Sequence, residues 1–202
     1  MEASCELPDG VQARAIVSEV VDIRVGSVAV SMPFPSHGLA HLELSASKSG
    51  RYLVVRHCSG QSEESYRVLD RRASLRTVAS ASNISGETNS VAFSNDERRF
   101  IAAIPSSCKQ WWECLEDVDG TDEAGRAYFE FGTLLTHDLQ ARSRTKTSMR
   151  IWLEDDWSMH WEPYDPFLLP SFTSSASVTL QLPWGPEALR FPFGDVVWLR
   201  PP

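Results

Sequence analysis

Short runs of alternating apolar and polar residues, separated by turn-forming residues, constrain this chain more than any other feature of its sequence. A run of this kind that is rich in β-branched and aromatic side chains is typical of a β-strand. The clearest example is 51–56, Arg-Tyr-Leu-Val-Val-Arg. The same pattern predicts strands within 15–30 and at 41–46, 66–69, 75–78, 90–93, 99–104, 128–135, 148–153, 177–182, 188–193 and 196–199.

Helix signals are sparse by comparison. Residues 107–117 could form one short helix, capped by Ser106 or Ser107, and residues 154–161 a second one. The chain has 12 prolines, concentrated after Glu162, and proline favours loops and edge strands over central strands. The sequence therefore predicts an all-β fold with one or two short helices.

One segment of the chain is repeated. Residues 44–55 match residues 91–102, because each contains an apolar strand end, a Ser-x-x-Gly/Glu-Arg turn and a second apolar strand. Residues 68–75 and 136–143 follow as a second matching pair, and each of them carries an Asp. This order predicts two consecutive meanders of antiparallel strands.

The repeated pattern resembles the blades of β-propellers of the WD-repeat or TolB kind. The turn in those families is typically Ser-Pro-Asp-Gly-Lys/Arg; here Lys48 and Asn95 occupy the proline position, and Glu97 replaces the glycine in the second copy. The resemblance covers about residues 40–145 and implies blades at about 40–88 and 89–145, followed by a Trp/Pro-rich part at 146–202. An open twisted sheet, a sandwich and a small propeller all remain compatible with these meanders.

Composition indicates an ordinary globular protein. The 202 residues are 42% hydrophobic and 23% charged, which predicts a single domain spanning 1–202. The formal charge of -8 disfavours nucleic acid and anionic membranes as partners and suits a basic protein surface. The acidic N-terminus has no signal-peptide pattern, so we expect a cytoplasmic protein with free thiols.

Catalytic motifs are missing from the sequence. It has no Gly-x-Ser-x-Gly elbow, no P-loop and no Gly-x-Gly-x-x-Gly. His37 and His41 have the spacing of zinc ligands on a helix, but the nearby Pro33, Pro35 and Gly38 argue against a helix there. We therefore predict no catalytic residues, no cofactor and no metal.

Two clusters combine tryptophan with acidic residues, and we predict that they bind a partner. Trp and Tyr bury a large area while keeping a polar group, so they often anchor interfaces, although tryptophan is also a common core residue. For Trp152 both roles remain open. The predicted partner-binding residues are Trp111, Trp112, Glu116, Asp117, Asp119, Asp155, Asp156, Trp157 and Trp161.

These features favour a non-enzymatic protein-binding module, most concretely a cytosolic inhibitor or immunity-type protein that covers a basic surface. One alternative is a hydrolase that uses carboxylates among Glu154, Asp155, Asp156 and Asp165. Another is a structural domain that assembles through unpaired sheet edges.

Overall fold

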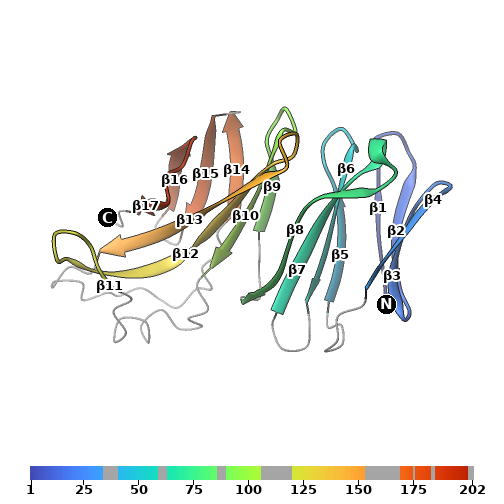
Figure 1. Cartoon of the computed structure of the whole chain (residues 1–202). Coiled ribbons are helices and arrows are strands. Elements are labelled where there is room, and N and C mark those ends of the chain that lie inside the picture. Colours follow the sequence, from blue (N-terminus) through green and yellow to red (C-terminus); the bar gives the residue numbers. More distant parts are fainter. Residues whose placement is uncertain are drawn as a thin grey trace. The chain divides into compact units, whose positions relative to one another are not determined.

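The computed structural model of the chain describes residues 1–33, 41–58, 63–85, 90–105, 120–152, 169–174, 176–182 and 185–199, and it consists of β-strands (Figure 1). Within these ranges the only helical segment is a 3-10 turn, Arg71–Ala73. Both predicted helices, at 107–117 and 154–161, lie outside the described residues. Contacts divide the chain into two compact units, one of residues 1–87 with 139–142 and one of residues 88–138 with 143–202.

The first unit contains two four-stranded antiparallel sheets, each a meander in sequence order. The strands of the first sheet are β1 (Glu2–Glu6), β2 (Gln12–Val17), β3 (Val20–Val25) and β4 (Val28–Pro33). Those of the second sheet are β5 (His41–Ala46), β6 (Tyr52–Cys58), β7 (Glu63–Asp70) and β8 (Arg76–Ser85). Antiparallel neighbours need only short turns, which is why turn residues separate the strands so regularly.

Alternation of side chains along the strands builds the core of the first unit. Ala13, Ala15 and Ile23 are fully buried on one face of the first sheet, and Leu53 and Val55 are fully buried on one face of the second. These residues belong to one apolar cluster, so the two sheets pack face to face.

The second unit contains a larger and a smaller sheet. The larger one has the order β17-β13-β12-β10-β9, with β11 paired to β12, and the smaller one has the order β14-β15-β16. The strands of the larger sheet are β9 (Ser90–Phe93), β10 (Arg99–Pro105), β11 (Gly120–Thr121), β12 (Ala127–Asp138), β13 (Ser143–Trp152) and β17 (Val196–Trp198). Those of the smaller one are β14 (Leu169–Ser174), β15 (Ser177–Leu182) and β16 (Gly185–Arg190).

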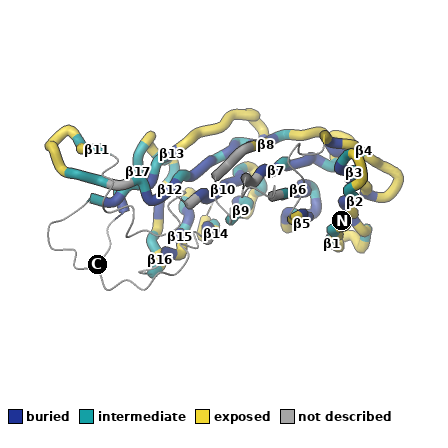
Figure 2. Tube along the Cα trace, turned by 90° about the horizontal axis from the view of Figure 1, so that it is seen from below, coloured by how far each residue is buried: buried dark blue, intermediate teal, exposed yellow. Residues whose placement is uncertain are grey.

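The core of the second unit lies between these two sheets. Ile101, Leu134 and Met149 from the larger sheet join Val178 and Leu180 from the smaller one in a single apolar cluster, and all five are fully buried. Figure 2 shows buried and half-buried residues along the strands and exposed residues in turns such as the one after β11. The side chains that alternate with these core residues along the strands lie on the opposite face of the larger sheet.

The predicted all-β fold is confirmed, with four-stranded antiparallel sheets of the propeller-blade type. One pairing differs from the expected antiparallel meander, because β17 lies parallel to β13. A parallel neighbour needs a long connection from the preceding strand, which a local turn motif does not reveal.

The repeated turn adopts the same hydrogen-bonded structure in both copies. The N–H of Ser47 donates to the carbonyl of Tyr52 (2.9 Å), and the N–H of Ser94 donates to the carbonyl of Arg99 (2.9 Å). The Ser47 and Ser94 hydroxyls, both buried, accept from the N–H groups of the same two partners at 3.1 and 2.8 Å. The serine is repeated because its hydroxyl closes the turn.

An arginine–aspartate ion pair then joins each turn to the end of the neighbouring strand. Arg51 donates from Nε and from its second terminal nitrogen to the Asp70 carboxylate, at 3.3 and 2.8 Å. In the second copy the Nε of Arg98 donates to the Asp138 carboxylate at 3.0 Å. In each copy, the turn and the aspartate at the neighbouring strand end are therefore held together within one sheet.

The glycine position of this turn generates a prediction about stability. Gly50 has φ +69°, and a Cβ there would lie 2.7 Å from Cδ of Pro8, whereas Glu97 occupies the equivalent position with φ 53°. We expect Gly50→Ala to lower the free energy of unfolding by about 2 kcal/mol, through backbone strain and the clash. Glu97→Gly should instead raise it by about 0.5 kcal/mol, because glycine relieves the strain but also loosens the unfolded chain.

Urea unfolding of the two variants beside wild type measures both effects. A Gly50→Ala protein as stable as wild type would show that the turn does not require this conformation.

Candidate functional site

All nine predicted partner-binding residues lie outside the described residues: Trp111, Trp112, Glu116, Asp117, Asp119, Asp155, Asp156, Trp157 and Trp161. The carboxylates of the alternative hydrolase, at 154–156 and 165, also lie there. In the sequence, the stretches that contain these residues nevertheless adjoin described strands. Residue 119 precedes β11, and residue 153 follows the last residue of β13, Trp152.

An aromatic–arginine cluster occupies the face of the larger sheet that points away from the core of the second unit. It consists of Arg126, Tyr128, Arg150, Trp152 and Trp198. The register explains why these residues meet, since Tyr128 is opposite Trp152 and Arg150 is opposite Trp198. Residues on either side of Arg150 along β13 point to the other face and into the core.

The rings of this cluster are in direct contact. The Trp152 and Trp198 rings stack with centroids 4.2 Å apart and planes 3° from parallel. Tyr128 meets Trp198 edge to face at 5.5 Å. An arginine guanidinium carbon lies over each end, Arg126 at 4.3 Å from the centre of the Trp152 ring and Arg150 at 4.2 Å from that of Tyr128. Cations prefer the face of an aromatic ring, so this order is electrostatically favourable.

Asp122 fixes one end of the cluster. Its carboxylate accepts from the Trp152 indole N–H (3.0 Å) and from the backbone N–H (2.9 Å) and Nε (2.8 Å) of Arg126. Partial desolvation alone would raise the pKa of this carboxyl, but the donated hydrogen bonds lower it below its usual value. Asp122 is therefore charged at neutral pH and holds both Trp152 and Arg126 in place.

The short strand β11 packs closely against the cluster. A Cβ on Gly120 would lie 2.8 Å from the hydroxyl oxygen of Tyr128. A larger residue at position 120 would therefore displace the hydroxyl end of Tyr128, which glycine avoids.

The cluster has the composition of a protein-binding surface. Trp, Tyr and Arg are the residues most often found at the energetic centre of protein interfaces. The three rings are half-buried, and Arg126 keeps 58% of its side chain exposed. The sequence left the role of Trp152 open and did not indicate Trp198, because Trp198 reaches the cluster through the parallel β17 pairing.

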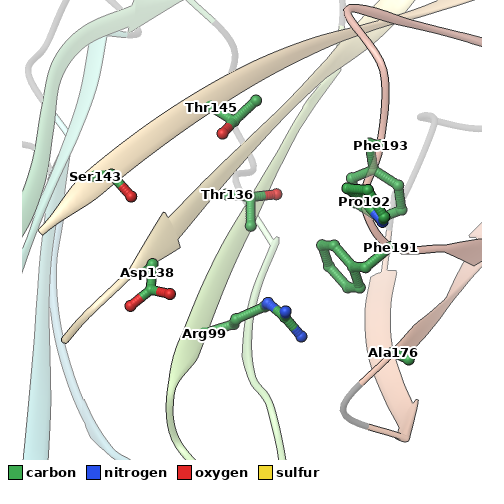
Figure 3. Close-up of a pocket in the computed structure, with 9 residues that line it drawn as sticks. All are labelled: Arg99, Thr136, Asp138, Ser143, Thr145, Ala176, Phe191, Pro192 and Phe193. Atoms are coloured by element: carbon green, nitrogen blue, oxygen red, sulfur yellow. The ribbon is translucent and has the colours of Figure 1, made fainter. Parts of the chain in front are cut away.

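A pocket of about 380 Å³ lies on the other face of the same sheet, between the larger and smaller sheets of the second unit. Its lining on the larger sheet comes from β10, β12 and β13: Arg99, Thr136, Asp138, Ser143 and Thr145. Its opposite wall consists of Ala176, in the turn before β15, and of the three residues after β16: Phe191, Pro192 and Phe193. Figure 3 shows the Arg99 guanidinium and the Thr136 hydroxyl directed toward the phenylalanine wall.

The pocket adjoins one end of the apolar core, on the same face of the larger sheet. Arg99 is opposite Asp138, and Thr136 is opposite both Ile101 and Thr145. One step further along the strands, Leu134 pairs with Ala103 and Thr147, inside the core. The pocket is therefore the place where the two sheets separate and polar side chains replace aliphatic ones. No local pattern in the sequence indicates the pocket, since its two walls come from separate parts of the chain, 99–145 and 176–193.

His137 points to the face opposite the pocket. Burial and the charge of Arg144 lower its pKa to about 4, so the ring is neutral at pH 7. It packs against Phe100 with ring centres 5.9 Å apart. His137 is a core residue of the sheet and contributes no charge to either site.

Neither a metal centre nor a membrane-crossing helix is found in the described part of the chain. No three His, Cys, Asp or Glu residues there are grouped as metal ligands. No helix there is long and apolar enough to cross a bilayer.

No protein family and no curated protein matches this sequence. Several solved structures are similar to it, and two of them are described here. The Kuenenia stuttgartiensis hydrazine synthase aligns with a TM-score of 0.43 and 16% identity, over 88% of this chain and 48% of that one. The WD40 domain of SCAP from fission yeast aligns with a TM-score of 0.39 and 8% identity, over 96% of this chain and 61% of that one. The chain spans less than two thirds of the length of either structure.

The stacked tryptophans generate a prediction about coupling. Trp152→Ala, Trp198→Ala and the double variant form a double-mutant cycle in urea unfolding. We expect a coupling energy of about 0.5–1.5 kcal/mol, because each ring loses its partner in the other single variant. Strictly additive losses would mean that the two rings do not contact each other.

Proposed function

We propose that this chain is a non-enzymatic protein-binding module that holds its partner at the aromatic–arginine cluster. The observation that carries the proposal is the stack of half-buried Trp and Tyr rings between two arginines on a sheet face directed away from the core. A surface of this composition provides large contact area and polar groups together.

Rigidity of the cluster supports this role. The indole N–H of Trp152 is fixed by Asp122, and the Arg126 side chain is fixed by the same carboxylate. Side chains that are already ordered lose little conformational entropy when a partner binds. The cluster is therefore prepared for binding before any partner arrives.

Chain connectivity supports an extension of the same surface. Gly120 of β11 pairs with Tyr128, and Tyr128 pairs with Trp152. The residues predicted to bind a partner, at 111–119 and 155–161, come shortly before β11 and shortly after β13 in the sequence. We propose that their tryptophans and carboxylates enlarge the cluster into one interface.

Charge supports a partner with a basic surface. The formal net charge of -8 would attract such a partner over long range and raise its association rate. The most concrete form of the proposal is a cytoplasmic inhibitor or immunity-type protein that covers the basic active site of another protein.

The proposal predicts which variants lose the partner. A tagged wild-type protein, Trp198→Ala and Arg126→Ala are used to capture partners from the source lysate, followed by affinity measurement with the purified partner. We expect Trp198→Ala to weaken binding by roughly 30-fold or more and Arg126→Ala by roughly 5-fold. Binding of wild type should weaken as salt rises.

Arg24→Ala is the matched control, because Arg24 is an exposed arginine of the first unit with 61% of its side chain accessible. Its affinity should equal that of wild type. Thermal melting confirms that each variant is folded. A partner that binds folded Trp198→Ala and Arg126→Ala as tightly as wild type would contradict the proposed interface.

A further inference from the structure

We propose that the pocket between the two sheets of the second unit binds a carboxylate carried by an apolar or aromatic group. The pocket and the aromatic–arginine cluster are on opposite faces of the larger sheet, so this site does not depend on the proposed protein interface. Its volume of about 380 Å³ is within the range of pockets that hold small ligands, roughly 300–1,000 Å³.

The positively charged residue of the pocket, Arg99, occupies the position at which the first copy of the repeat has a buried residue. The residue after the turn arginine is Tyr52 in the first copy, where it is 1% exposed, and Arg99 in the second. Arg99 is half-buried, and its guanidinium carbon lies 4.9 Å from the centre of the Phe191 ring. The second copy thus has a charged side chain, directed into a pocket (Figure 3), where the first copy has a buried tyrosine.

The charge balance of the pocket favours an anion with a single charge. Asp138 is the acidic residue of the lining, and its carboxylate accepts a hydrogen bond from Arg98. Arg99 is the basic residue of the same lining. A carboxylate matches one guanidinium in charge and planar shape, whereas a doubly charged phosphate would also be repelled by the nearby Asp138.

The Thr136 side chain brings a hydroxyl group to the pocket lining. Oγ1 of Thr136 is buried and makes no hydrogen bond within the described residues. An unpaired buried hydroxyl costs free energy, and a carboxylate held by Arg99 would provide an acceptor for it. Thr145, its cross-strand neighbour, adds a second hydroxyl to the same lining.

The opposite wall fits an apolar group. The Phe191 and Phe193 rings are 4.1 Å apart, and Phe172 stacks behind Phe191 at 5.8 Å. Aromatic walls of this kind bind flat or branched apolar groups by contact and burial. The pocket therefore recognises a carboxylate and an apolar body at the same time.

Two sources of this chemistry are possible, a free aromatic acid and the C-terminal residue of another protein. The probes are 3-phenylpropionate and the peptide N-acetyl-Gly-Gly-Phe, titrated into the full chain by calorimetry. The same peptide with a C-terminal amide and phenyl phosphate serve as comparisons. Saturable binding of either carboxylate supports the site, and the tighter of the two identifies the source.

Variants separate the site from non-specific binding. Arg99→Gln should weaken carboxylate binding by roughly 10-fold or more, and Thr136→Val by roughly 5-fold. Arg144→Gln is the matched control, since Arg144 is an exposed arginine of β13 on the other sheet face, and it should bind like wild type. Thermal melting verifies folding, and Thr136→Val keeps the test decisive if Arg99→Gln fails to fold.

Three results would overturn the proposal. One is that neither carboxylate binds. Another is that the amidated peptide or phenyl phosphate binds as tightly as the carboxylates. The third is that folded Arg99→Gln and Thr136→Val bind the carboxylates as well as Arg144→Gln does.

Discussion

The ion pair between the turn arginine and the aspartate of the neighbouring strand end organises both repeated segments. Arg51 with Asp70 and Arg98 with Asp138 each connect a tight turn to a strand of the same sheet. In the first copy the aspartate also accepts from the N–H of Arg72 and so begins the 3-10 turn. In each copy the next strand begins at the residue after the turn arginine. Tyr52 and Arg99 both occupy that next position.

Side-chain alternation in the larger sheet then separates two possible binding surfaces. Along β13 the odd-numbered residues 145–151 face the smaller sheet, and Arg150 and Trp152 face the other way. A register shift in β12 between Glu130 and Gly132 changes which residues of that strand share a face, so Tyr128 joins the cluster while Thr136 lines the pocket. One sheet therefore carries an aromatic surface and a small-molecule pocket without mixing them.

The sequence predicted local structure well and long-range arrangement poorly. The Ser-x-x-Gly/Glu-Arg turns, the strands that flank them and the blade-like sheets follow from short-range patterns, and the structure confirms them. Trp198 in the cluster and Phe191 beside Arg99 depend on pairings and sheet packing between distant segments, which alternation alone does not specify. The predicted interface residues at 111–119 and 155–161 lie outside the described residues, so their role stays a prediction.

The equivalence of Tyr52 and Arg99 is tested most directly by urea unfolding of Arg99→Tyr. If Arg99 occupies a core position of the repeat and has been adapted for ligand binding, tyrosine should pack against Phe191 and Phe193. The free energy of unfolding should then equal or exceed that of wild type by up to about 1 kcal/mol. A loss of about 2 kcal/mol or more would show that Arg99 is needed for folding and that the two copies are not equivalent at this position.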